Sequence, residues 1–247
     1  MQPEADWIRP PWELPGVRAF CSTRAGNFNQ PPFGGFNTAN HVGDSPESVA
    51  QTRAWLSQYF HWSEQPQWLK QVHGTTVVEA KPDAVEREAD AVFSRQSGIV
   101  CTLHTADCLP VFFAAKNGSE VALAHAGWRG LAAGVLQATL AQLNTAPRDL
   151  SVWVGPAISA AHFEVGEDVL RAFDNTVSDT KHYFSPNERG RWQCDLAGIA
   201  HSLLQEYGVQ SISGGDLCSY TDERFFSYRR NNPTGRTLSL IWIDPAQ

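Results

Sequence analysis

The clearest hydrophobic pattern in the chain lies between residues 101 and 134, where two apolar runs flank the dipeptide Asn117-Gly118. Asn-Gly between apolar runs is the strongest short-range signal for a β-hairpin, because both residues tolerate positive φ. The pattern therefore predicts two strands joined at this dipeptide and followed directly by a helix.

A turn centred on Asn117-Gly118 also predicts which residues oppose each other, and it places Pro110 opposite His125. Side chains alternate between the two faces of a strand, so Cys108 and His125 are expected to project from one face as a diagonal pair. Such a pair is close enough to share a metal ion or a proton. The alternative is that Pro110, which donates no backbone hydrogen bond, marks the point where the first strand only begins.

Further strands and helices are predicted along the whole chain. Short apolar runs predict strands at 17–23, 76–78, 91–94, 98–105, 150–156, 209–213 and 237–243. Apolar residues at helical spacing and capping residues predict a helix starting at Ser45-Pro46-Glu47 and helices over 128–143, 165–174 and 195–207. Mixed elements with a clear hairpin and no repeat or linker indicate an α+β fold in one domain, residues 1–247.

The segment from Arg24 to Asn40 is rich in Gly, Pro, Asn and Phe and is predicted to be a long loop. Loops of such length in compact domains are usually functional or disordered. The aromatic side chains of Phe28, Phe33 and Phe36 favour an ordered loop that packs on the core.

Composition narrows the class of protein. The 247 residues are 42% hydrophobic and carry a formal net charge of −7, which argues against a nucleic-acid-binding surface. No secretory signal or membrane-length apolar run is visible, so we expect a cytoplasmic protein without membrane partners. The five cysteines are scattered and form no C-x-x-C motif, which favours free thiols.

His73, Cys108 and His125 are candidate metal ligands. Three nitrogen and sulfur ligands with a fourth position left to water are typical of a catalytic zinc site, whereas structural sites usually have four protein ligands. The same residues allow a second interpretation, in which Cys108 is a nucleophile, His125 is its base and Asp107 orients a neighbouring group. The third interpretation is a buried core thiol beside a hydrogen-bonded histidine.

Several arginines are candidates for binding an anion. The segment 125–130, HAGWRG, places two glycines at a strand-to-helix turn, where exposed N–H groups favour an anion beside Arg129. Arg24 in the long loop and Arg229, which follows aromatic residues, are further candidates, although such arginines are often only solvated. The chain lacks a P-loop and a dinucleotide-binding glycine motif, so nucleotide di- and triphosphates are not supported.

Four motifs resemble those of one known family. They are QVHG (71–74), TADCLPV (105–111), HAGWRG (125–130) and FFSYRR with TGR (225–236). They are similar to the YfiH family, which is also described as peptidoglycan editing factor, laccase-domain or polyphenol oxidase proteins. The resemblance runs almost from end to end, from Ser22-Thr23-Arg24 to Ile241-Trp242.

This resemblance implies a fold, a metal and an activity. The fold is an α-β-β-α layered sandwich like the catalytic domain of a cytotoxic deamidase toxin. The metal, usually assigned as zinc, is held by the residues that match His73, Cys108 and His125. Copper belongs to the older naming and is the alternative, but the chain has no H-x-H pair of the kind that multicopper oxidases need.

Family members are described as phosphorylases of adenosine, inosine and methylthioadenosine with adenosine deaminase activity. Phosphate and a purine nucleoside are thus the expected small-molecule partners. At the matching positions we expect catalytic roles for Cys108, His125, Asp107 and Arg129. The substrate or phosphate is expected to be bound by Arg24, Asn37, Gln71, Arg129 and Arg229.

Two other classes of function stay open from the sequence. One is an amidase that acts on cell-wall precursor peptides through zinc-activated water or Cys108, because bacterial members are linked to editing these precursors. The other is a binding or scaffolding protein whose zinc is structural, in which case removing the metal is expected to unfold the chain.

Overall fold

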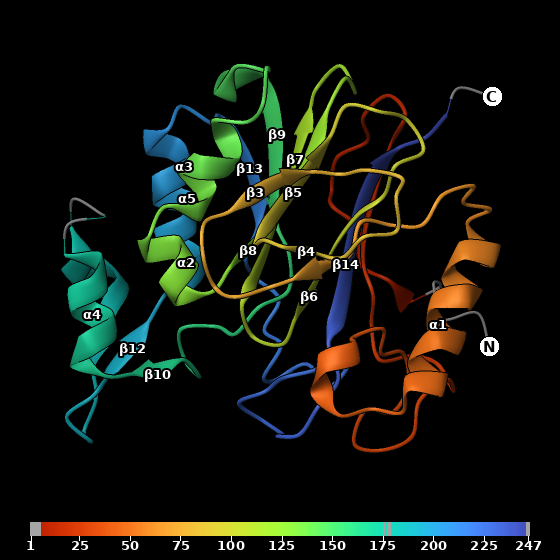
Figure 1. The fold of residues 1–247 in the computed structure, drawn as a ribbon. Helices are drawn as coiled ribbons and strands as arrows, with labels where there is room; N and C mark the ends of the chain where they lie inside the picture. The colour runs from red at the N-terminus through yellow and green to blue at the C-terminus, as the bar shows by residue number, and fades with distance from the viewer. Residues whose placement is uncertain (1–5, 175, 177–178, 246–247) are drawn as a thin grey trace.

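The hairpin predicted around Asn117-Gly118 lies in the middle of the larger sheet of the computed structural model (Figure 1). The structure describes residues 6–174, 176 and 179–245. Within them, the larger sheet has the strand order β13 (Ser211–Gly214), β9 (Leu150–Val154), β7 (Leu109–Ala115), β8 (Val121–Ala126), β5 (Ala91–Ser94), β3 (Val77–Glu79). Strands β9, β7, β8 and β5 pair antiparallel, whereas β13 and β3 join the edges as parallel strands.

The predicted register of the hairpin is confirmed, because Pro110 pairs with His125 and Leu109 pairs with Ala126. Strand β7 thus includes Pro110 rather than beginning after it. The turn differs in detail from a two-residue Asn-Gly turn. Only Gly118 of the dipeptide takes positive φ, at 74°, and its N–H donates to the Ala115 carbonyl at 2.8 Å.

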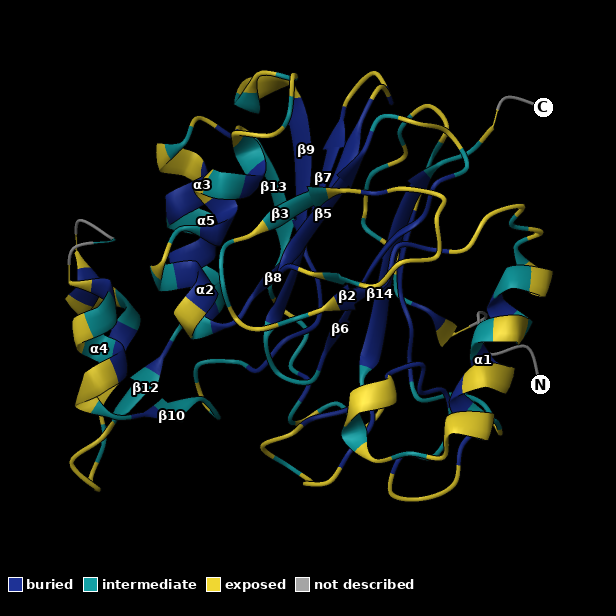
Figure 2. Ribbon diagram, viewed as in Figure 1, coloured by how far each residue is buried: buried dark blue, intermediate teal, exposed yellow. Residues whose placement is uncertain are grey.

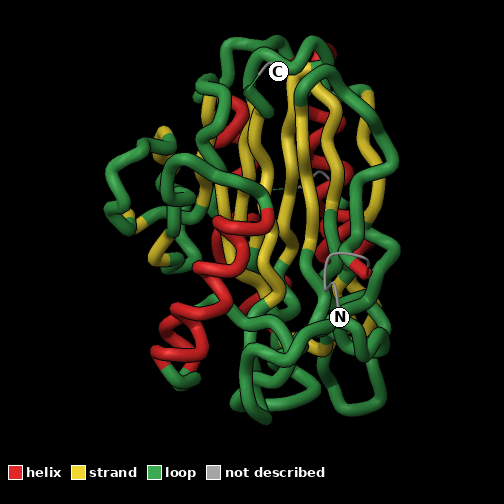
Figure 3. The backbone as a smooth tube through the Cα atoms, turned by 90° about the vertical axis from the view of Figure 1, so that its right-hand side faces the viewer, coloured by secondary structure: helices red, strands yellow, loops and turns green. Residues whose placement is uncertain are grey.

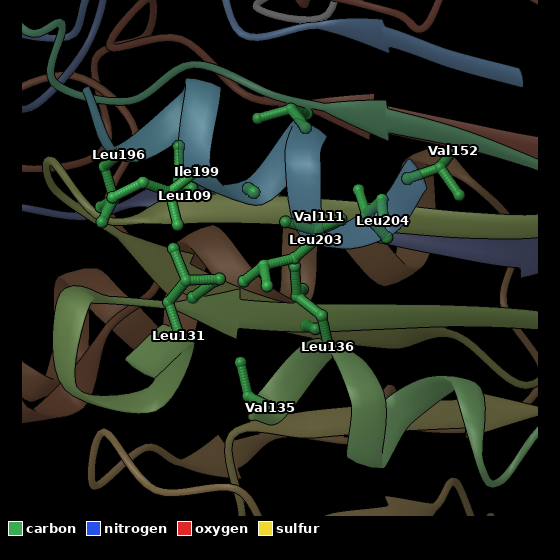
Figure 4. Packing of buried hydrophobic residues seen from close by; sticks show 14 of the residues in the cluster. Leu109, Val111, Leu131, Val135, Leu136, Val152, Leu196, Ile199, Leu203 and Leu204 are labelled. Carbon is green, nitrogen blue, oxygen red and sulfur yellow. The ribbon is translucent and has the colours of Figure 1, made fainter. Parts of the chain in front are cut away.

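Helices cover one face of the larger sheet. They are α2 (Trp128–Ala132), α3 (Val135–Leu140) and α5 (Leu196–Glu206), and α4 (Glu167–Phe173) packs against α2 from outside this layer. Leucine and isoleucine side chains of α2, α3 and α5 point at Leu109, Val111 and Val152 of the sheet (Figure 4). These apolar residues are fully or almost fully buried, and their removal from water is the main stabilisation of this layer.

A smaller sheet packs against the other face of the larger sheet. Its strand order is β1 (Val17–Cys21), β14 (Thr237–Ile243), β6 (Cys101–Thr105), all antiparallel. A second apolar core lies between the sheets and includes Leu103, Phe112, Leu123, Trp153 and Ile241. Figure 2 shows this sandwiched region as almost uniformly buried.

The outer face of the smaller sheet is covered by α1 (Pro46–Tyr59) and by aromatic side chains. Leu56 of α1, Phe20 of β1 and Trp242 of β14 belong to this third core together with Trp7. Figure 3, viewed from the side that carries α1, shows the long strands running side by side. The predicted start of α1 is confirmed, since the Ser45 hydroxyl accepts the Ser48 N–H as an N-terminal cap.

The long loop after β1 is ordered and packed, as its aromatic residues predict. Phe36 is completely buried and contacts Trp7 and Phe28 edge-on. Asn29 fixes the loop from within, because its amide donates to the Asn37 carbonyl at 3.1 Å and its carbonyl oxygen accepts the Asn37 N–H at 2.8 Å.

The prediction of one continuous helix over 128–143 is wrong. Gly134 takes φ of 94°, a left-handed conformation that ends α2 and separates it from α3. The apolar stripe survives this break, because Leu131, Val135 and Leu136 all remain buried in the same core. The strand predicted over 98–105 is also shorter than expected, since Gly98 has φ of 81° and β6 begins only at Cys101.

The other predicted strands and helices form with end shifts of a few residues, and β14 has the predicted bounds. Short elements complete the described chain: β2 (Leu69–Lys70) with β4 (Arg87–Glu88), β10 (Glu164–Val165) with β12 (Trp192–Cys194) and β11 (Phe184–Pro186), and 3-10 turns at Asn40–Val42, Pro147–Asp149 and Thr180–Tyr183. The mixed α/β class is confirmed. None of the described helices has the length and apolar character that crossing a membrane requires.

Candidate metal centre and its cavity

His73, Cys108 and His125 converge at one end of the larger sheet. One ligand atom from each lies within 4.8 Å of the others, and the Cys108 Sγ is 3.9 Å from the His73 Nε2. His125 belongs to β8, Cys108 comes directly before β7, and His73 lies in the loop after β2. The diagonal placement of Cys108 and His125 that the hairpin register predicted therefore brings them together.

Asp90 holds the two histidine segments in place. Its buried carboxylate accepts backbone N–H bonds from Val72 at 3.2 Å, His73 at 2.9 Å and Gly74 at 2.6 Å. The same carboxylate lies 2.8 Å from the His125 Nδ1. These bonds fix the loop in which His73 adopts φ of 62°, and they leave the Nε2 of His125 to face the other ligands.

Gly127, directly after β8, leaves the space that this group of side chains needs. A Cβ atom at this position would lie 2.8 Å from the His73 Cδ2 and 3.0 Å from the Cys108 Sγ. Both separations are shorter than van der Waals contact, so a side chain here would push the ligands apart. The glycine is needed for this close approach and not for its backbone angle, because its φ is −67°.

The electrostatics of the pair Cys108 and His125 favour a thiolate beside an imidazolium. Burial alone would raise the pKa of Cys108, but the neighbouring His125 and His73 lower it to about 6. Burial alone would lower the pKa of His125, but Cys108 and Asp90 raise it to about 9. By contrast, burial raises the pKa of Cys194 to about 12, and all five cysteines are free.

The three side chains open into a cavity of about 400 Å³. Apolar side chains of Ile158, Phe163 and Tyr228 form part of its wall. The polar part of the lining comes from separate regions of the chain, namely His41, Gln71, His73, His104, Thr105, Asp107, Cys108, His125, Arg229 and Arg236. An apolar wall with a few converging polar groups is typical of a small-molecule site.

Three further residues predicted for the site line this cavity. Asp107 has φ of 91°, and its two carboxylate oxygens accept the Ser219 hydroxyl and the Arg229 N–H, each at 2.7 Å. Gln71 uses its amide to bind the backbone of His104, donating at 2.9 Å and accepting at 2.8 Å. Asp107 thus connects Arg229 to the loop before Cys108, and Gln71 connects the His73 loop to β6.

The structure does not bring Arg24, Asn37 and Arg129 into the lining of this cavity. Arg24 lies over the ring of Phe226. Arg129 is exposed, and its guanidinium lies 4.3 Å from the ring centre of Trp128. Asn37 is buried and donates to the Asp44 carboxylate at 2.8 Å. Their expected contacts with substrate or phosphate stay predictions.

Two important residues, Asp90 and Arg236, were not predicted from the sequence. Asp90 is far from the histidines along the chain, and a single aspartate before a strand carries no motif. Arg236 lies in the TGR motif, so its signal was present, but nothing local to the sequence indicated that its side chain reaches the same cavity as Cys108.

The donor set fits a metal ion of the zinc type. Histidine nitrogens and a cysteine sulfur are preferred ligands of Zn²⁺, and three protein ligands leave a position open. The support of His125 by Asp90 is the usual arrangement behind a ligating histidine. Within the described residues this is the one group of three or more such ligands that converges.

The fold and this site define a mixed α/β protein with a His-Cys-His centre at the end of a hairpin. A family model described as multi-copper polyphenol oxidoreductase laccase matches residues 18–244. The chain belongs to this family, the YfiH family that its motifs resemble.

Relatives of the chain match over nearly their whole length. The chain is 45% identical to the purine nucleoside phosphorylase PA4543 of Pseudomonas aeruginosa over 240 residues, which cover 96% of this chain and 98% of that protein. It is 44% identical to the purine nucleoside phosphorylase YfiH of Escherichia coli over 241 residues, with 96% and 98% covered.

Solved structures share the fold. The protein NMB0706 of Neisseria meningitidis superimposes with a TM-score of 0.92 at 39% identity, covering 97% of this chain and 100% of that one. YlmD of Geobacillus stearothermophilus has a TM-score of 0.86 at 27% identity, with 97% and 96% covered.

Proposed function

We propose that this protein is a purine nucleoside phosphorylase that acts at the His73–Cys108–His125 centre. The observation that carries the proposal is a three-ligand group that opens into a cavity holding both apolar walls and two arginines, in a chain similar to named phosphorylases. Adenosine, inosine and methylthioadenosine are the substrates we propose.

The cavity offers separate surroundings for the parts of such a substrate. Ile158, Phe163 and Tyr228 provide apolar and aromatic surface against which a purine ring can stack. Asp107 holds the loop before Cys108 and the backbone of Arg229 together, which fixes the polar side of the cavity. We propose that His73, Cys108 and His125 hold zinc, which when bound would act as a Lewis acid.

The experiment that tests the proposal is a mass-spectrometric assay of metal-analysed protein with adenosine, with and without phosphate. Adenine and ribose 1-phosphate should appear only when phosphate is present. The products should disappear in His73→Ala and persist in His182→Ala, which removes an exposed histidine outside the cavity. A zinc-loaded protein that leaves adenosine intact in phosphate buffer would refute the proposal.

We also propose adenosine deaminase activity at the same centre. The support is the Lewis acid that a three-ligand site can hold next to a cavity of about 400 Å³. In phosphate-free buffer the protein is expected to convert adenosine into inosine and ammonia, with the bond between base and sugar intact. Release of neither product without phosphate would exclude this activity.

For the architecture we propose the α-β-β-α layer order of the resemblance, in one domain formed by residues 1–247. The support is the succession of cores, in which α2, α3 and α5 pack on the larger sheet, the two sheets pack on each other, and α1 covers the smaller sheet. The cores share strands, so the layers do not separate into independent units.

An amidase that acts on cell-wall precursor peptides is the second candidate. It is favoured by the sequence of contacts from the Cys108 thiol to His125 and on to the buried Asp90, which is the order of groups in a thiol nucleophile with its base. This function predicts amide hydrolysis that needs no phosphate. Loss of phosphate-dependent nucleoside cleavage upon chelation, with no amide turnover in any preparation, would exclude it.

A further inference from the structure

Two arginine side chains, Arg229 and Arg236, line the cavity beside the metal-ligand group. Among the residues that the structure describes, neither guanidinium lies within ion-pair distance of a carboxylate. Arg229 is exposed to water, whereas Arg236 is half-buried, and a cation taken partly out of water without a counter-charge is unfavourable. The pair therefore leaves positive charge in the cavity for a ligand to neutralise.

Arg236 is held at its place by the backbone. Its N–H donates to the Asn37 side-chain carbonyl at 3.0 Å. Its Nη1 donates to the carbonyls of Thr234 at 2.9 Å and Gly235 at 3.0 Å. An arginine has five N–H donors, and those on Nε and Nη2 donate to no atom in the described part of the chain. One edge of the guanidinium is thus fixed and the rest is free to bind.

Arg229 lies on the same cavity and is also oriented. Its backbone N–H is bound by Asp107, and its Nη1 donates to the Glu164 carbonyl at 3.1 Å. The guanidinium lies over the ring of Phe163, 5.6 Å from its centre. The position of Arg229 is therefore tied to the loop that also carries Cys108.

The negative groups near Arg236 do not fully compensate the burial of its guanidinium, because its pKa is lowered overall. Burial lowers its pKa, and Cys108, Tyr228 and Asp107 raise it. Both oxygens of Asp107 already accept hydrogen bonds. A metal ion on His73, Cys108 and His125 would add positive charge. Two further titratable groups line the cavity at this end, His41 and His104. Burial and the positive charge of Arg236 lower the pKa of His41, and burial and nearby cations, Arg236 among them, lower the pKa of His104.

We propose that Arg236, assisted by Arg229, binds a phosphate oxyanion in this cavity. The inference rests on the proposed phosphorylase function and names its phosphate site. A planar guanidinium with a fixed edge and free N–H groups suits bidentate contact with phosphate oxygens. Arg24 and Arg129 do not line the cavity, so Arg236 is the principal anion ligand that we propose for it.

Phosphorolysis at this site replaces one bond to C1′ of the ribose by another. A phosphate oxygen forms a bond to C1′ of the ribose, and the bond between C1′ and the purine N9 breaks. The electron pair of that bond goes to N9, which takes up the proton of hydrogen phosphate. The products are ribose 1-phosphate and the free base, and Arg236 neutralises charge on the phosphate throughout.

The test measures binding of inorganic phosphate to metal-loaded protein by isothermal titration calorimetry, together with the KM for phosphate. Arg236→Gln is expected to weaken phosphate binding and to raise the KM for phosphate, each by about tenfold or more, because a charged hydrogen-bonding partner is lost. Arg229→Gln should change the affinity and the KM in the same directions by a smaller factor. Arg171→Gln, which removes an exposed arginine of α4, serves as the matched control and should change neither.

A parallel titration with adenosine 5′-monophosphate distinguishes the source of the phosphate group. Loss of affinity for inorganic phosphate in Arg236→Gln supports a co-substrate site, and loss only for the nucleotide supports an oxyanion site for a phosphorylated nucleoside. Arg236→Lys is the control for misfolding. It keeps the positive charge but loses the bidentate contact, so it should retain part of the phosphate affinity.

Equal phosphate affinity and equal KM for phosphate in wild type, Arg236→Gln and Arg229→Gln would overturn the assignment, even if the wild type is a phosphorylase. The same holds if Arg129→Gln alone loses phosphate dependence. Arg236-dependent phosphate binding without any phosphorolysis would instead contradict only the proposed function.

Discussion

Asp90 supports the candidate metal centre from a position outside the lining of the cavity. Its carboxylate accepts three consecutive backbone N–H groups from the His73 loop and contacts the imidazole of His125. Two ligand-bearing segments that are distant in the sequence therefore share one anchor. The arrangement selects the tautomer of His125 and keeps His73 in its left-handed backbone conformation.

Substituting Asp90→Asn should weaken metal binding by roughly 10- to 100-fold, as for other groups that support a ligand. The amide offers one acceptor and places an NH₂ group among N–H donors. Competition with a chromophoric chelator measures the metal affinity, and Asp216→Asn, at an exposed aspartate, is the control. Unchanged affinity in Asp90→Asn would contradict the role given to this carboxylate.

Gly127 allows a second test at the residue scale. In Gly127→Ala the new methyl group would meet the His73 ring and the Cys108 sulfur at 2.8 and 3.0 Å, so metal affinity should fall although the backbone angle suits alanine. Gly34→Ala is the matched control, because its Cβ would make ordinary contacts of 3.5 Å or more. If Gly127→Ala binds metal as tightly as the wild type, the ligands can move apart without loss of metal affinity, which would contradict the role given to Gly127.

At the scale of elements, the β7–β8 hairpin was predictable because its information is local. Asn117-Gly118 between apolar runs specified the turn, and alternation then placed Cys108 near His125. The helix break at Gly134 was not predicted, since the apolar stripe continues through it. Asp90 and Arg236 reach the site through tertiary packing, for which a single sequence carries no periodic signal.

Glu120 ties the hairpin to its surroundings at the opposite end. Its buried carboxylate accepts the N–H groups of Asn144 at 3.2 Å and Thr145 at 2.5 Å, and pairs with Arg95 at 3.0 Å. Burial alone would raise the pKa of Glu120, but the contacts with Thr145, Asn144 and Arg95 outweigh it and lower the pKa.

A lowered pKa means that Glu120 stabilises the fold above its unfolded pKa, and that this contribution is lost as the pH falls through the folded value. Glu120→Gln should therefore reduce the free energy of unfolding by about 1–3 kcal/mol near neutral pH. The difference from wild type should shrink below about pH 4.5. Urea unfolding of wild type and variant at neutral pH and below about pH 4.5 measures this difference in the free energy of unfolding. A difference that grows in acid would contradict this account.

For the whole molecule, stability comes from three apolar cores, and none of them includes a candidate metal ligand. We therefore expect the buried aromatic and aliphatic side chains to hold the sheets and helices together when no metal is bound. Metal removal is therefore a test of whether the site is catalytic or structural.

Chelation should abolish nucleoside cleavage while the far-ultraviolet circular dichroism of the protein stays native. The unfolding midpoint should fall only by the amount that binding linkage provides. Zinc added back should restore activity. A chain that unfolds upon chelation would contradict a catalytic centre and favour the scaffolding class, in which the metal is structural.

The most direct test of the central claim follows the oxygen atoms of phosphate during turnover. Inosine and fully ¹⁸O-labelled phosphate are incubated with the zinc-loaded protein, and the sugar product is analysed by mass spectrometry. The account predicts hypoxanthine and ribose 1-phosphate that carries all of the label, because a phosphate oxygen attacks C1′ and no bond to phosphorus breaks. Free ribose, or ribose 1-phosphate that has lost label, would contradict it.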